Sequence, residues 1–124
     1  MTEKWEDDGR RAVMQDFAEQ AHSEGTHFFY VRIPGDIQPI ERGERFEDPL
    51  DAALQVAGLG SVTGGGSQIA EGTTVEYCGL DVVVNDRSRG IELIRRILQS
   101  VDCPRTAVIE EYLPAYSELP IWPS

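Results

Sequence analysis

The order of strand-like and helix-like segments limits the fold of this chain more than any other feature. Strand-like segments alternate apolar and polar residues or are rich in β-branched and aromatic residues, whereas in helix-like segments the apolar residues recur at helical spacing. The predicted strands span 27–33, 61–69, 75–85 and 106–112, and the predicted helices span 8–24, 49–57 and 86–101. After a first helix, the order is therefore strand, helix, strand, strand, helix, strand.

Glycine and proline mark where these segments begin and end. Gly25 and Gly58 are suited to the left-handed position that ends a helix, and Asp48-Pro49 predicts an N-cap followed by proline at the first helical position. The charged, proline-containing segment 34–48 is predicted to be a loop, and 113–124 an irregular, proline-rich tail. The 124 residues suit a single domain, with its core in 27–112.

The stretch GLGSVTGGGSQI at 58–69 raises the question of a phosphate-binding loop. Both the dinucleotide and the Walker motifs need a strand before the loop and a helix after it, and the Walker motif also needs a lysine. Here a helix precedes, a strand follows and the lysine is missing. Gly64, Gly65 and Gly66 are therefore predicted to lie in a bulged edge strand, the first arm of a hairpin that turns at 68–74. An anion bound by the bare amides of these glycines is the alternative.

The element order is that of the split βαβ pattern, and over 27–112 the chain resembles the ferredoxin-like (α/β plait) superfamily. The resemblance is one of pattern and carries no family signature. It implies an α+β fold with a four-stranded antiparallel sheet in the order 4-1-3-2. Both core helices lie on one face, and the extra N-terminal helix precedes the core.

Strand alternation predicts an aromatic second face on this sheet. Its residues are Phe28, Tyr30, Arg32, Tyr77, Asp81, Val83, Val108, Glu110 and Tyr112. Such a surface is too apolar to remain bare. The N-terminal helix could cover it, a second copy could pack on it, or it could bind a partner, chiefly through Phe28, Tyr30, Tyr77, Val108 and Tyr112.

Three charged residues of that face could converge near the centre of the sheet. Arg32, Asp81 and Glu110 form either an acid/base pair held by an arginine or a structural ion pair. His27 is a further weak catalytic candidate, although a general base needs a cleft and an orienting partner.

The remaining residue types point to no cofactor and no metal site. The chain has two histidines and two cysteines, and it has no HExxH motif and no zinc-type cysteine spacing. Cys78 is expected to be a buried small hydrophobe, whereas Cys103 is expected to be partly exposed. Neither has a histidine close in sequence, which disfavours a catalytic thiol.

The net charge of −11 disfavours nucleic acid as a partner. No apolar run is long enough for a membrane span, and the N-terminus lacks the apolar core of a secretory signal, so we expect a cytoplasmic protein that binds no membrane. Either a second copy, giving a homodimer, or another protein is the expected partner.

Two classes of function remain. The first is a small acidic binding domain without enzymatic activity that uses the aromatic face for self-association or for a partner, as ligand-sensing domains or immunity proteins do. The second is a small dimeric plait-type enzyme with a pocket on the sheet face that uses Arg32, Asp81 and Glu110.

Overall fold

A computed structural model describes the backbone of residues 2–123 and the side chains of residues 9–123. Within this part of the chain, the fold is an α+β fold built on a five-stranded antiparallel sheet in the order β2-β3-β1-β4-β5. The strands are β1 (His27–Pro34), β2 (Gly60–Glu71), β3 (Thr74–Val84), β4 (Val108–Glu111) and β5 (Ser117–Pro120). The helices are α1 (Thr2–Ser23), α2 (Pro39–Glu41), η1 (Arg42–Glu47), α3 (Asp48–Val56) and α4 (Arg87–Ser100).

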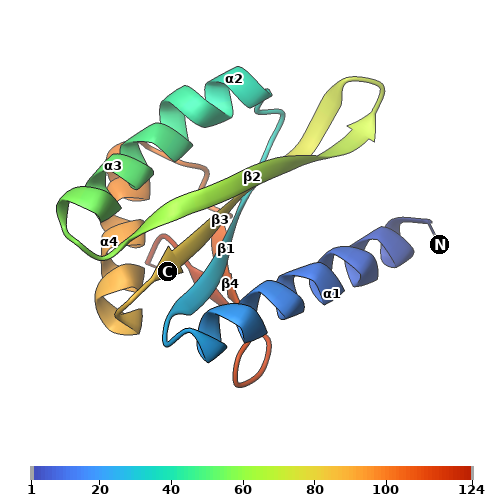
Figure 1. Ribbon diagram of the computed structural model, residues 1–124. Coiled ribbons are helices and arrows are strands. Elements are labelled where there is room, and N and C mark those ends of the chain that lie inside the picture. The colour runs from blue at the N-terminus through green and yellow to red at the C-terminus, as the bar shows by residue number, and fades with distance from the viewer. Residues whose placement is uncertain (1, 124) are drawn as a thin grey trace.

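The helices lie on both faces of the sheet (Figure 1). The segment α2–η1–α3 and helix α4 cover one face, and α1 lies along the other. The main core lies under α3 and α4, where fully buried residues such as Phe29, Leu80 and Ile109 meet Leu54 and Ile94. The predicted alternation of inward and outward residues on β1, β3 and β4 is confirmed by this division.

Helix α1 covers the aromatic face that the strand pattern predicted. Met14, Ala18 and Ala21 are buried against the sheet, where they pack on Phe28 and Tyr30 among others. The helix begins well before residue 8, and Gly25, at a φ of 79°, follows its end as expected. None of the helices described between residues 2 and 123 has the apolar length that a bilayer crossing needs.

The prediction of a loop over 34–48 is wrong for most of its length. The helical backbone starts at Pro39 and runs through a π-helical stretch into α3, so Asp48 lies within a helix and is not its N-cap. Pro49 cannot donate to the carbonyl four residues earlier and would clash with it in an α-helix. The wider π-turn just before it accommodates the ring without ending the helix.

The C-terminal tail is also more regular than predicted. Its β5 segment pairs with β4 and makes a fifth strand, and Ile121 is buried in the main core. Pro120 is tolerated because β5 is an edge strand, where a missing N–H can face outward. The predictions of a four-stranded sheet and of an irregular tail are therefore both wrong.

The glycine-containing hairpin is longer than expected. Strands β2 and β3 meet at a turn formed by Gly72 and Thr73, and Gly72 has a φ of 59°. The nearest register shift lies between Val62 and Gly64, so the bulge sits beside the three glycines and not within them. Gly64, Gly65 and Gly66 themselves pair regularly with Asp81, Leu80 and Gly79, and none of the three has a positive φ.

Candidate functional site

The three charged residues singled out from the sequence do not form one cluster. Arg32 and Glu110 meet, with Nη1 and Oε2 2.7 Å apart. Asp81 is separated from Glu110 by strand β1, because Tyr30 pairs across the ladder with Asp81 on one side and with Glu110 on the other. The sheet therefore places the two carboxylates in different surroundings.

Glu110 is a fully buried carboxylate held by two arginines and a tyrosine. Arg10 of α1 approaches Oε1 at 2.8 Å, and the Tyr112 hydroxyl donates a short hydrogen bond to the same oxygen. Burial, the hydrogen bond to Glu110 and the nearby charge of Glu110 raise the pKa of Tyr112. With its charge paired and its oxygens occupied, Glu110 is a structural group and not a free acid or base.

Arg10 is the member of this cluster that the sequence did not reveal. Its guanidinium also lies over the rings of Tyr30 and Tyr77, at 5.1 and 5.6 Å from their centroids. Desolvation opposes the charge of Arg10, but the hydrogen bond and charge of Glu110 outweigh it and raise its pKa. Arg10 therefore fixes α1 on the sheet, and helical spacing gives no signal for such a polar anchor.

Asp81 lies in a groove between α1 and β2, which we call the α1–β2 groove. It consists of two hollows of about 260 and 230 Å³ that share Asp81. The first is lined by Arg10, Met14, Tyr30, Gly65, Gly66, Ser67, Gln68, Tyr77 and Asp81. The second is lined by Phe17, Gln20, Ala21, Glu24, Phe28, Thr63, Asp81 and Val83.

The absence of side chains on β2 keeps this groove open. A Cβ on Gly64 would lie 3.0 Å from Oδ2 of Asp81, and a Cβ on Gly66 would point into space with nothing within 4 Å. A Cβ on Gly65 would instead point toward Glu47 and Arg42, at 3.1 and 3.4 Å from their side chains. Because these residues have no side chains, the backbone of β2 can lie close to Asp81.

The Asp81 carboxylate has no hydrogen-bond or ion-pair partner among residues 9–123; only its backbone carbonyl accepts a bond, from Thr63. Burial raises the pKa of Asp81, and the charge of Glu47 raises it further. A half-buried carboxylate without a cation is costly to keep charged. Asp81 is therefore a partly buried charged residue of this groove whose carboxylate has no hydrogen-bond or ion-pair partner among the described residues.

This environment predicts that Asp81→Asn stabilises the fold. Because the pKa of Asp81 is higher in the folded chain than in the unfolded one, the free energy of unfolding falls as the pH rises above the ordinary aspartate value of about 3.9. Asparagine removes this penalty, and we expect a gain of roughly 0.5–2 kcal/mol at pH 7. Urea denaturation should show a smaller gain at pH 4 than at pH 7. A loss of stability would mean that the carboxylate has a partner.

The aromatic residues predicted to bind a partner lie mostly beneath α1. Phe28, Tyr30, Tyr77 and Tyr112 are buried there, and Val108 is half-buried. Tyr30 and Tyr77 still line the α1–β2 groove, and Phe17 of α1 remains 41% exposed beside it. The groove is therefore one accessible part of the predicted face.

The other candidates lie elsewhere. His27 lines a separate hollow beyond the C-terminal end of α1, far along β1 from Arg32. Cys78 and Cys103 are both free and buried, so the expected partial exposure of Cys103 is wrong, and burial raises the pKa of both thiols. Among the described side chains, no three His, Cys, Asp or Glu residues lie close enough to hold a metal ion.

Comparison of the chain with protein-family models, with curated proteins and with solved structures finds no match. The function is therefore inferred from the geometry and the charge of the chain itself.

Proposed function

We propose that this chain is a binding domain without enzymatic activity, and that the α1–β2 groove binds a basic segment of a protein partner. The observation that carries the proposal is the Asp81 carboxylate, which is half-buried, has no cation among residues 9–123 and is flanked by aromatic side chains.

The chemistry of the groove favours an organic cation such as a lysine or arginine side chain. A cation placed beside Asp81 would restore the ion pair that the carboxylate lacks. Tyr30 and Tyr77 line the same hollow as Asp81, but Arg10 already lies over both rings, so they offer the partner apolar contacts and no free cation–π site. Phe17 and Val83 provide apolar walls for the neighbouring residues of the partner.

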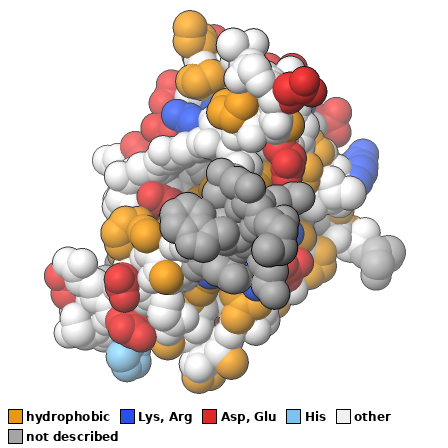
Figure 2. All heavy atoms as spheres, turned by 90° about the vertical axis from the view of Figure 1, so that its right-hand side faces the viewer, with side chains coloured by type: hydrophobic (Ala, Val, Ile, Leu, Met, Phe, Trp, Pro, Cys, Tyr) orange, Lys and Arg blue, Asp and Glu red, His pale blue; other side chains and the backbone are white. Residues whose placement is uncertain are grey.

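The charge of the chain favours the same kind of partner. A net charge of −11 attracts basic surfaces and speeds their association. Acidic side chains are spread over the end of the molecule that Figure 2 presents, with hydrophobic side chains between them. Glu24 lines the groove and is exposed, and Asp16 is exposed elsewhere on α1.

The alternative of a small enzyme that uses Arg32, Asp81 and Glu110 has less support. Glu110 is closed in by Arg10, Arg32 and Tyr112, and Asp81 lies on the far side of β1. Neither carboxylate lies beside a histidine or cysteine in the described hollows.

We also infer a ferredoxin-like (α/β plait) arrangement for residues 27–112. Its support is that β4, β1, β3 and β2 are neighbours in that order, with α3 and α4 on one face. Helix α1 and strand β5 are additions to this arrangement, and α1 occupies the face on which many such domains associate.

The proposal is tested with a short peptide that has lysine between two leucines and with the same peptide carrying norleucine in place of lysine. Calorimetric titration should show tighter binding of the lysine peptide. Asp81→Asn should weaken it by about tenfold or more, as the loss of a charge-assisted hydrogen bond does, and should remove the preference for lysine.

Glu92→Gln is the matched control. Glu92 is exposed on α4, which packs on the opposite face of the sheet, so the substitution removes the same charge away from the groove. We expect less than about a twofold change in affinity. Equal losses in the two variants, or equal binding of the two peptides, would overturn the proposal. A dimer in light scattering that Asp81→Asn dissociates would instead identify a second copy as the occupant.

A further inference from the structure

The outer edge of β2 is a stretch of backbone to which no strand described between residues 2 and 123 pairs. β2 has twelve residues, against four in β5 at the other edge of the sheet, and Figure 1 shows it running between α3 and α1. Natural edge strands usually prevent pairing by being short or by carrying lysine, proline or a bulge. β2 has no lysine or proline, and its register shifts lie on either side of residues 64–68. Residues 64–68, which we call the open edge, are therefore regular and unprotected.

The ladder shows which residues of the open edge direct their backbone groups outward. Gly35 donates to the carbonyl of Glu76 beside the end of β1, so the even-numbered residues of β3 bond toward β1 and the odd-numbered ones toward β2. Within the open edge, the partners of those odd-numbered residues are the even-numbered residues of β2. Because the direction alternates along a strand, Gly65 and Ser67 direct their N–H and C=O groups away from the sheet.

The glycines also allow a neighbouring strand to reach Asp81. A residue added opposite Gly64 has its side chain on the same face of the sheet as Asp81, with which Gly64 pairs. The backbones of the added strand and of β3 are two strand spacings apart, about 10 Å. Oδ2 of Asp81 covers part of that distance, because it lies only 3.0 Å from where a Cβ of Gly64 would stand. The four-carbon stem of a lysine can span the rest.

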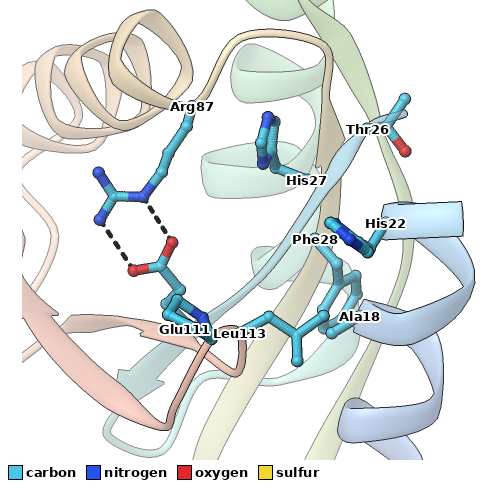
Figure 3. Close-up of a pocket in the computed structure, with 9 residues that line it drawn as sticks. Ala18, His22, Thr26, His27, Phe28, Arg87, Glu111 and Leu113 are labelled. Carbon is cyan, nitrogen blue, oxygen red and sulfur yellow. Dashed lines mark hydrogen bonds and ion pairs between the residues drawn. The ribbon is translucent and has the colours of Figure 1, made fainter. Parts of the chain in front are cut away.

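Asp81 is the carboxylate of the sheet that a cation from outside can pair with. The two buried carboxylates among the described side chains are already paired: Glu110 is held by two arginines, and Figure 3 shows Glu111 bound by Nε and Nη2 of Arg87. β2 itself carries no basic residue, so the same edge of a second copy cannot supply the cation. The charge therefore favours a strand from a different, basic protein.

From these observations we propose that the basic segment of the partner binds as an extended strand added to the open edge, with its lysine opposite Gly64 and paired with Asp81. The inference rests on the proposed function, because it gives the conformation and the register of the same partner segment. Backbone hydrogen bonds to Gly65 and Ser67 hold the segment, and the ion pair fixes its register, which is how strand addition usually divides affinity and specificity. Glycines inside a strand are typical of places where another backbone approaches closely.

Backbone methylation of the lysine peptide tests strand addition. The peptide is lengthened to cover the open edge, and two versions carry N-methyl groups either on the lysine and every second residue or on the residues between. Each version blocks the N–H groups of one edge of the extended peptide and leaves the other edge free. We expect one version to bind at least about tenfold more weakly than the unmodified peptide, and the other to stay within about threefold.

Ser67→Pro removes one outward N–H group from the protein itself. Proline is tolerated in an edge strand where its nitrogen faces away from the sheet, so we expect an unchanged circular dichroism spectrum. Proline also removes the hydroxyl that accepts a hydrogen bond from Arg42, and Ser67→Ala is therefore the matched control. We expect Ser67→Pro to weaken the lysine peptide by about fivefold and Ser67→Ala by less than about twofold. If Ser67→Pro fails to fold, the methylated peptides still decide.

The outcomes separate this inference from the proposed function. If the lysine peptide binds through Asp81 but the two methylated versions bind equally, strand addition is wrong and the proposed function stands. The same holds if Ser67→Pro binds the peptide as well as Ser67→Ala does. A lysine peptide that binds no better than its norleucine counterpart overturns both. A dimer in light scattering that Ser67→Pro dissociates would identify a second copy as the added strand, and would overturn the assignment to a basic partner.

Discussion

Replacing Glu110 with alanine is expected to destabilise the fold by about 3–5 kcal/mol, the usual cost of removing one partner from a buried ion pair. The carboxylate is fully buried and accepts from Arg10, Arg32 and Tyr112. Without it, two guanidinium groups keep their positive charges in a partly desolvated site beneath α1. The midpoint of urea denaturation measures the loss.

Glu118 provides a control that shares the same arginine. It lies 3.4 Å from Nη2 of Arg32, but its side chain is 39% exposed. Exposed ion pairs contribute roughly 0–1 kcal/mol, so Glu118→Ala should have a much smaller effect than Glu110→Ala. Similar losses in the two variants would show that burial of Glu110 is not what makes it important.

The strand alternation predicted which residues face each side of the sheet. Along β1 and β3 the side chains point alternately to opposite faces, and apolar residues occupy nearly every position that faces α3 and α4. The period of two is a local property of the backbone and is visible in the sequence. The same pattern placed Tyr30, Asp81 and Glu110 on the aromatic face.

Features that depend on packing between residues far apart in the chain could not be predicted from the sequence. Nothing local predicts that Arg10 pairs with a residue one hundred positions later, or that β5 adds to β4 despite its proline. The helical backbone over 39–47 was hidden by the glycine and prolines around it, because the π-helical turn that accommodates them is rare. The two hollows beside α1 likewise depend on where that helix lies on the sheet.

Gly64, Gly65 and Gly66 lie in the edge strand β2, as the sequence predicted, but Gly79 has a role that the sequence did not suggest. The ring of Tyr30 lies directly over Gly79, where a Cβ would overlap the phenol. Tyr30 is buried, and the guanidinium of Arg10 lies on its ring, so it has little freedom to move. We therefore expect Gly79→Ala to cost about 1–3 kcal/mol, as overpacking of a core does.

Gly66 is the matched position, because it pairs with Gly79 across the same ladder and a Cβ there meets nothing within 4 Å. Gly66→Ala should change the free energy of unfolding by less than about 0.5 kcal/mol. Its methyl group would nevertheless project into the α1–β2 groove, so it should weaken the lysine peptide while the fold stays intact. If both alanines destabilised the fold equally, the glycines would serve β2–β3 pairing alone. A stable Gly66→Ala variant with reduced peptide binding would instead show that the bare strand is needed to reach Asp81.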